Sequence, residues 1–335
     1  MMETMNILNR YTAGDNMRLL SNEEKRIGRM VFEKSFEIRK GEKVLIVADP
    51  GKQEEAFVFF ELAKRYTSNL SCIIFDGMTE NAQEPPEDIL EAMKTSDIAL
   101  LTTSYSLTHT QARRAASATG TRIASLPNIT LEMMKRILVT DPQAMRGDSE
   151  KIAALLTAGD EVIITSPQGS NISFSISGRP GIPDTGILSH PGDFGNLPAG
   201  EGFIAPVEGT ANGILIVDGA IADVELDAPV KIIVKAGIAE SIAGGTAARE
   251  LERRMDLAGD KARVLCELGI GTNPAAQLSP NVLEAEKVYG TCHFAFGNNS
   301  TFGGMNFVLF HTDCVIADPI ITIDNRIIVR DKTIL

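Results

Sequence analysis

Residues 44–63 read VLIVADPGKQEEAFVFFELA and contain a strand, a turn and a helix in direct succession. Residues 44–48 form an unbroken apolar run, which is typical of a strand that is covered on both faces. The Asp49-Pro50-Gly51 turn comes next. The helix after it carries apolar side chains at helical spacing, at Ala56, Phe59, Phe60 and Ala63. This stretch therefore predicts one strand–helix unit of an α/β fold.

The same alternation extends to both sides of this stretch. An amphipathic helix over 21–38 opens with Ser21 and Glu24 at the spacing of a capping box. Further strands are expected at 71–75, 97–102 and 121–125, each followed by a helix, near 87–95, 109–118 and 130–138. Strands that alternate with amphipathic helices predict a parallel, doubly wound, Rossmann-like sheet.

Dinucleotide binding is not expected of this half. Neither G-x-G-x-x-G nor G-x-x-x-x-G-K-[ST] follows the first strand. Lys52 follows Gly51, but we interpret it as a solvated residue at the start of a helix and not as part of a phosphate loop.

The composition changes near residue 160, where glycine and proline begin to separate short apolar runs. This punctuation predicts a β-rich second half. Strands are expected at 161–166, 172–176, 203–206, 213–218, 220–225 and 230–235, followed by a charged helix at 246–257. We therefore predict two domains, a Rossmann-like α/β domain over 1–150 and a β-rich α+β domain over 151–335.

The composition restricts the range of partners. The chain has 335 residues, 44% of them hydrophobic, and a formal net charge of −12. This negative charge argues against nucleic acid or an anionic membrane as a partner. The first residues lack the pattern of a secretory signal, and no apolar run reaches the length of a membrane span. A soluble, cytoplasmic protein is expected.

Residues that could bind a metal ion gather in the last seventy residues, in VLCELGIGTNP (264–274), EKVYGTCHFAFGNN (286–299) and FHTDCVI (310–316). The sequence contains four histidines, and His293 and His311 lie here, with Asp313 two positions after His311. In strands, the alternation of side chains places His311 and Asp313 on the same face. Together with Glu267 and Glu286, these residues favour a divalent-metal site over the alternative of satisfied core histidines.

The cysteines in these segments are expected to pack in the core. Cys266, Cys292 and Cys314 each adjoin a polar candidate, so strand alternation turns them to the opposite, packed face. No CxxC pair occurs. Glu201, in FGNLPAGEGFIAP, is a further candidate because it precedes an apolar strand, although a solvated turn residue is an equal alternative.

Four ordered motifs, NLPAGEGFIAP, CELGIGTNP, EKxxGTxHxAFG and HxD, resemble those of the aminopeptidase T family of metallo-aminopeptidases. The resemblance covers residues 196–331 and implies a homodimeric exopeptidase that removes N-terminal amino acids from small peptides. It implies two divalent ions (Zn, Co, Mn or Mg), Glu201 and Glu267 as catalytic carboxylates, and Glu267 as the bridge between the ions. The implied metal ligands are Glu201, Glu267, Glu286, His293, His311 and Asp313, with a longer spacing here between Glu286 and the histidine.

One departure from this pattern leaves two alternatives open. The family places a catalytic tyrosine seven residues after the histidine of H-x-A-x-G, and this chain has Ser300 there. Loss of an oxyanion donor lowers peptidase rates by about 10²–10³. The scaffold also resembles 2,5-dihydroxypyridine 5,6-dioxygenase, where His293, His311 and Asp313 would hold one iron(II) ion. The other alternative is a non-catalytic metal-binding homologue.

Overall fold

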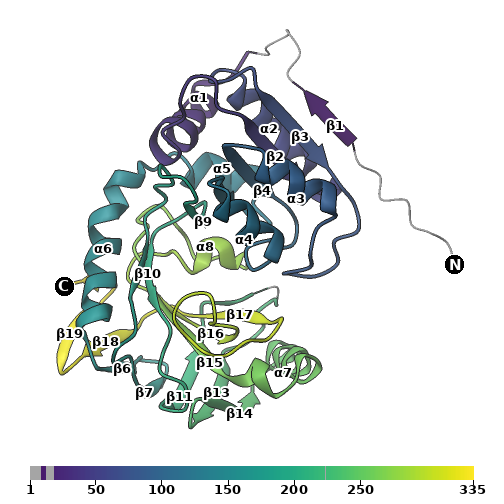
Figure 1. The fold of residues 1–335 in the computed structure, drawn as a ribbon. Coiled ribbons are helices and arrows are strands. Elements are labelled where there is room, and N and C mark those ends of the chain that lie inside the picture. The colour runs from purple at the N-terminus through teal and green to yellow at the C-terminus, as the bar shows by residue number, and fades with distance from the viewer. Residues whose placement is uncertain (1–8, 13–18, 223) are drawn as a thin grey trace, which may run out of the picture. The chain divides into compact units, whose positions relative to one another are not determined.

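The computed structural model describes residues 9–12, 19–222 and 224–335 (Figure 1). The chain forms two compact units. The first comprises the chain up to Ala144 together with Gly186–Ala199, and the second comprises Met145–Thr185 and Gly200–Leu335.

The first unit is built on one sheet with the strand order β1-β3-β2-β4-β5-β9. The five strands from β3 to β9 are parallel, and β1 is antiparallel to β3. The strands are β1 (Asn9–Thr12), β2 (Val44–Ala48), β3 (Leu70–Ile74), β4 (Ile98–Thr102), β5 (Arg122–Ser125) and β9 (Phe194–Asn196). The predicted α/β fold class with a parallel, doubly wound sheet is confirmed.

Strand β2 lies inside this sheet and all five of its residues are fully buried. Leu45 and Val47 pack in one apolar cluster with Ile89 of α3 (Glu87–Lys94) and Ala116 of α4 (Gln111–Ala118). The uninterrupted apolar run therefore marks a strand covered on both faces, as predicted. The helices of this unit are α1 (Asn22–Gly28), α2 (Gln53–Ala63), α3 (Glu87–Lys94), α4 (Gln111–Ala118) and α5 (Leu131–Ile137).

Three details of the first unit differ from the sequence predictions. The helix expected over 21–38 keeps its capping box but continues as a π-helix over Arg29–Ser35. Lys52 is buried, and its ammonium donates to the carbonyl of Ile129. Residues 186–199, inside the range assigned to the second domain, return to the first unit because β9 pairs with β5.

The second unit contains, within the described residues, a six-stranded and an eight-stranded sheet. All their strand pairs are antiparallel. The six-stranded order is β12 (Ala220–Ile221), β17 (His311–Ile316), β16 (Cys292–Gly297), β15 (Leu265–Gly271), β10 (Glu201–Ile204) and β8 (Ile182–Asp184). The eight-stranded order is β14 (Ile238–Ala243), β13 (Val230–Lys235), β11 (Asn212–Val217), β7 (Asn171–Ser175), β6 (Glu161–Thr165), β18 (Ile320–Ile323), β19 (Arg326–Arg330) and β20 (Thr333–Ile334).

One apolar core joins the two sheets of this unit. Phe174 of β7 meets Phe294 of β16 edge to face, with ring centroids 5.9 Å apart. The helices are α6 (Pro142–Ala158), α7 (Thr246–Ala258) and α8 (Val282–Ala285), and Leu251 of α7 lies in the same core. Among the residues that the structure describes, no helix is long and apolar enough to cross a membrane.

Candidate metal centre

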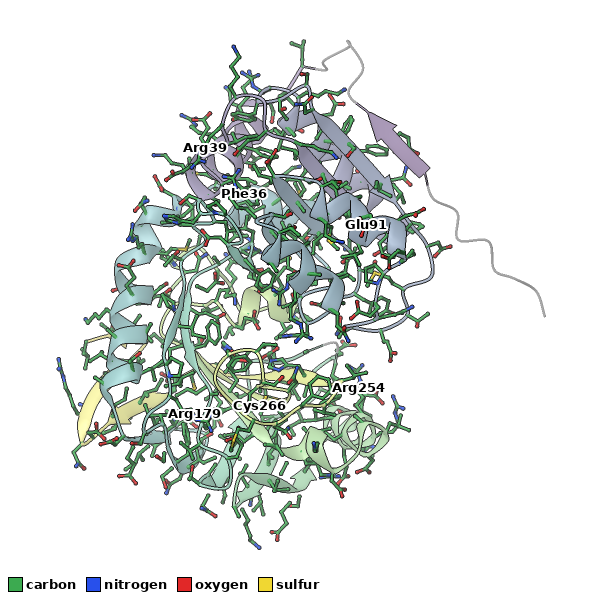
Figure 2. The ribbon with its side chains drawn as sticks, in the orientation of Figure 1. Phe36, Arg39, Glu91, Arg179, Arg254 and Cys266 are labelled. Atoms are coloured by element: carbon green, nitrogen blue, oxygen red, sulfur yellow. The ribbon has the colours of Figure 1, made fainter. Side chains whose placement is uncertain are left out.

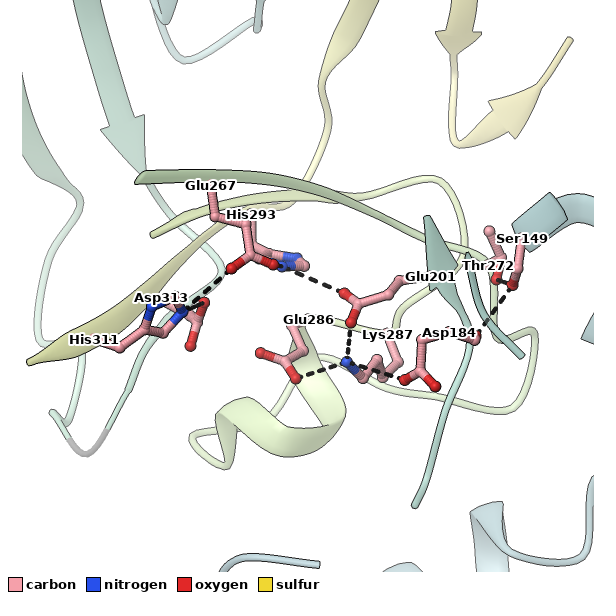
Figure 3. A network of polar contacts seen from close by, with 10 residues as sticks. All are labelled: Ser149, Asp184, Glu201, Glu267, Thr272, Glu286, Lys287, His293, His311 and Asp313. Atoms are coloured by element: carbon pink, nitrogen blue, oxygen red, sulfur yellow. Dashed lines mark hydrogen bonds and ion pairs between the residues drawn. The ribbon is translucent and has the colours of Figure 1, made fainter. Parts of the chain in front are cut away.

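Four neighbouring strands and the end of α8 bring the six predicted ligand residues together in the second unit (Figure 3). Glu201 begins β10, Glu267 lies on β15, His293 on β16, and His311 and Asp313 on β17. Asp313 pairs with Ala295, which in turn pairs with Glu267, so both carboxylates lie in one row across the sheet. Glu286 follows the last turn of α8.

The opposite face of these strands is apolar. Cys292, Phe294 and Cys314 alternate with the ligand residues and belong to the core between the two sheets. These residues anchor β16 and β17, so the imidazoles and carboxylates on the other face project from a rigid support. The predicted alternation is confirmed for these two strands.

Cys266 is buried as predicted, but its side chain does not lie on the predicted face. A register shift between Leu265 and Glu267 interrupts the alternation of β15, so Leu265 packs in the core. Cys266, labelled in Figure 2, is buried, and its Sγ lies 3.7 Å from His311 Nδ1. A β-bulge changes the direction in which side chains point, and nothing in the local sequence predicts this one.

His293 lies over a glycine of the next strand. Gly269 of β15 pairs with His293, and a Cβ atom at Gly269 would lie 2.0 Å from the imidazole Cε1. Only glycine leaves room for the ring. The glycine in CELGIGTNP therefore has a defined role in placing His293.

The ligand atoms fall into two groups that share Asp313. Glu267, His311 and Asp313 form one, and Glu286, His293 and Asp313 form the other. Within each group the atoms lie within 4.8 Å of one another. The Nε2 atom of His311 lies 3.3 Å from Glu267 and 3.4 Å from Asp313, while that of His293 lies 3.7 Å from Glu267.

The orientation of the imidazoles fits a metal ion. His311 Nδ1 lies 3.1 Å from the carbonyl oxygen of Asn298, which can only accept a hydrogen bond. Nδ1 therefore carries the proton, which leaves Nε2 with its lone pair directed at the carboxylates whenever the ring is neutral. Glu201 Oε2 and His293 Nδ1 are buried without a hydrogen-bond partner among the described residues.

The electrostatics show a surplus of negative charge. Burial opposes ionisation of Glu267, but both imidazoles outweigh it and hold the pKa of Glu267 well below its usual range. Burial likewise opposes the charged form of His293, yet Glu267 and Glu201 raise its pKa to about 9. Burial, with the carboxylates of Asp313 and Glu201, raises the pKa of Glu286 to about 8 against the effect of Lys287. A divalent cation would balance these groups.

A family comparison identifies the family to which the chain belongs. The family model of the 2,5-dihydroxypyridine 5,6-dioxygenases (NicX) matches residues 27–335. The chain belongs to this dioxygenase family. Membership makes the chain an enzyme and implies a divalent metal ion, for which the centre has suitable donors.

Individual relatives agree with the family match. The 2,5-dihydroxypyridine 5,6-dioxygenase of Pseudomonas putida KT2440 is 25% identical over 242 residues, 67% of this chain and 67% of the relative. The solved structure of 2,5-dihydroxypyridine dioxygenase from Pseudomonas putida KT2440 has a TM-score of 0.80 at 20% identity, covering 95% of this chain and 98% of that one. Wild-type AmpT from Thermus thermophilus has a TM-score of 0.63 at 15% identity, covering 90% and 94%.

The prediction of a metallo-aminopeptidase, and with it the description as a hydrolase or protease, is wrong. The family match and the curated relative name a dioxygenase. At 15% identity, AmpT shares only its fold with this chain. The motifs that resembled aminopeptidase T supply strands β10, β15, β16 and β17, so they report the common scaffold and not the reaction.

Ser300 is exposed. It occupies the position where the aminopeptidase T pattern has a catalytic tyrosine. Its hydroxyl donates to the side-chain oxygen of Asn298 at 2.8 Å. This contact stabilises the turn whose carbonyl orients His311.

Sequence reasoning missed Lys287 as a member of this cluster. Its side chain is 1% exposed, and its ammonium lies 2.5 Å from Glu201, 2.8 Å from Glu286 and 3.7 Å from Asp184 (Figure 3). Lys287 is the second residue of the EKxxGTxHxAFG motif. Nothing in this motif indicates that its ammonium is buried among carboxylates.

The centre is more accessible at one end. The side chains of His293 and Lys287 are 1% exposed, whereas His311 and Asp313 are 16% and 15% exposed. The candidate ligands on β17 are therefore the most exposed of the six.

Proposed function

We propose that this chain is a ring-cleaving dioxygenase that acts on a dihydroxypyridine and uses one iron(II) ion held by His293, His311 and Asp313. The observation that carries the proposal is that Asp313 belongs to a ligand group with each histidine. Two histidines and one carboxylate with further positions open are the ligand set of non-haem iron(II) oxygenases. The family match supports the reaction class.

The reaction requires no external reductant. A 5,6-dioxygenase breaks the ring bond between C5 and C6 and places both atoms of one O₂ molecule in the product. Iron(II), when bound, would supply the one-electron chemistry with O₂ that an aromatic ring cannot begin alone. The residues of this chain hold the donors in place and limit the access of water.

Two contacts keep His311 in position for this role. The Asn298 carbonyl fixes the ring tautomer, and the ring of Phe302 lies edge-on to the imidazole with centroids 6.3 Å apart. Phe302 also packs against Phe203 at 5.6 Å. Glu267 lies beside the Nε2 atoms of both histidines and is placed to serve as a further carboxylate ligand.

The test combines metal content with oxygen uptake. Protein purified without oxygen and loaded with iron(II) is expected to bind about one equivalent. It should consume one O₂ for each 2,5-dihydroxypyridine that loses its ring absorbance. His311→Ala and Asp313→Asn should lose both iron and uptake, whereas Asp331→Asn, at an exposed carboxylate in the turn between β19 and β20, should retain both. Iron-loaded protein that consumes no O₂ with any dihydroxypyridine isomer contradicts the proposal.

Two expectations about partners accompany this proposal. A small aromatic molecule suits a largely buried centre whose β17 residues are the most exposed, and it replaces the peptide expected from the sequence. The homodimer remains a prediction, which light scattering of the purified protein would check.

A further inference from the structure

The ammonium of Lys287 lies against half of the ligand cluster. It contacts Glu201 Oε1 and Glu286 Oε1, at 2.5 Å and 2.8 Å. Both backbone groups of the lysine are hydrogen-bonded: its N–H donates to the Glu284 carbonyl, and its carbonyl accepts from the Asn273 N–H. The ammonium is therefore a fixed charge inside the centre and not a surface group folded inward.

Without this ammonium, the same residues would suit a second metal ion. Glu286, His293 and Asp313 already place ligand atoms within 4.8 Å of one another. Glu201 is 6% exposed, and its Oε2 has no hydrogen-bond partner among the described residues although it lies 3.3 Å from His293 Nε2. Figure 3 shows the Glu201 carboxylate directed between His293 and Lys287. Asp313, which belongs to both ligand groups, would then bridge two ions.

We propose that Lys287 takes the place of a second metal ion and thereby restricts this enzyme to a single one. A buried ammonium offsets one negative charge of Glu201 and Glu286 and engages one oxygen of each. A dication binding between these carboxylates would have to displace it. Because Lys287 pairs with Glu286, the second ligand group cannot bind an ion of its own. His293 is then free to bind the ion that His311 and Asp313 hold. The inference rests on the proposed function for the role of that first ion.

The test counts metal ions in apoprotein titrated with Zn²⁺ or Mn²⁺ and then desalted. Wild-type protein is expected to retain one equivalent. Lys287→Met keeps the length of the side chain and removes its charge, so this variant should retain two. Its Mn²⁺ form should give the electron paramagnetic resonance spectrum of a spin-coupled pair.

Three further variants serve as controls. Lys52→Met removes another buried lysine, in the first unit, and should retain one equivalent. Lys287→Arg keeps the charge and should also retain one. Glu201→Gln combined with Lys287→Met removes one carboxylate along with the ammonium and should return the count to one.

The inference is overturned if wild-type protein binds two equivalents, or if folded Lys287→Met binds one. If Lys287→Met does not fold, Lys287→Gln takes its place. Two metal equivalents in wild-type protein would contradict the inference without any variant. Zn²⁺ counting is independent of turnover. One ion without ring cleavage would therefore refute the proposed function alone, whereas iron-dependent cleavage with two ions would refute this inference alone.

Discussion

Asp313 contributes to both ligand groups, so the centre depends on it more than on any other side chain. Asp313→Asn keeps its size but removes its negative charge and one acceptor oxygen. We expect the iron content of purified protein to fall at least tenfold, measured by elemental analysis. Glu267→Gln should cause a smaller loss because Asp313 still reaches both groups. Equal losses of iron in the two variants would show that Glu267 contributes as much to metal binding as Asp313.

Gly269 offers a second test at the residue scale. Gly269→Ala puts a Cβ atom into the space of the His293 imidazole, 2.0 Å from Cε1, so the ring must move. We expect metal affinity, measured by titration, to fall by about 10–100-fold, as when groups that orient metal ligands are removed. The matched control is Gly147→Ala in α6, where no described atom lies within 4 Å of the added Cβ. That change should leave affinity unchanged and stabilise the helix by about 0.5–1 kcal/mol.

That candidate ligands on one strand share a face could be predicted because strand alternation is a local property. His311 and Asp313 share a face wherever β17 is a strand, and the neighbouring apolar residues show which face is packed. Cys266 could not be predicted because a bulge depends on pairing with another strand. Nor could the role of Lys287, since its partner Glu201 lies 86 positions away and only the folded sheet brings the two together.

At the scale of elements, α7 shows how a distant carboxylate starts a helix. Asp227 accepts from the N–H groups of Thr246 and Ala247 at 2.8 Å and 2.9 Å. A Cβ atom at Gly245 would lie 2.2 Å from its Oδ2, so this glycine admits the carboxylate. The hydrogen bonds from Thr246 and Ala247 hold the pKa of Asp227 well below its ordinary value of 3.8.

This contact predicts a dependence of stability on pH. A carboxylate whose pKa is lower in the folded protein stabilises it above pH 3.8 and loses that effect as the pH falls below it. We expect Asp227→Ala to lower the melting temperature by a few degrees at neutral pH and to reduce the difference from wild type below pH 3. Calorimetry at several pH values would measure both. A constant difference across this range would show that the carboxylate acts only by packing.

Element boundaries followed the sequence wherever an apolar pattern was strong. The run at Val44–Ala48 became β2 over the predicted residues. Of the strand expected over 220–225, Ala220–Ile221 form β12 and pair with β17, whereas residue 223 lies outside the described residues. The π-helix after Arg29 had no signal in the pattern, since its apolar spacing also suits an α-helix.

At the scale of the whole molecule, the two units have separate apolar cores, and every candidate ligand lies in the second. A ligand that binds only the folded state stabilises the part that it binds. Removal of the metal by a chelator should therefore increase hydrogen exchange in β10, β15, β16 and β17. Exchange in β2 and β4 should stay unchanged, as measured by mass spectrometry of peptides. An equal increase in β2 and β4 would show that the units unfold as one.

The architecture was predictable because alternating strands and helices leave few arrangements, whereas the return of residues 186–199 was not. Strand β9 has only three residues, within a segment rich in glycine and proline that reads as a loop. The strand forms because it pairs with the free backbone edge of β5, and this pairing cannot be predicted from the local sequence.

The position of β9 sets an order for synthesis. A nascent chain that has emerged up to residue 150 contains β1 to β5, but the backbone of β5 has no neighbour on its outer side. That edge stays open to other chains until Phe194–Asn196 has left the ribosome. The first sheet therefore closes only after α6, β6, β7 and β8 have been made. The first unit can therefore be completed only after synthesis of the second unit has begun.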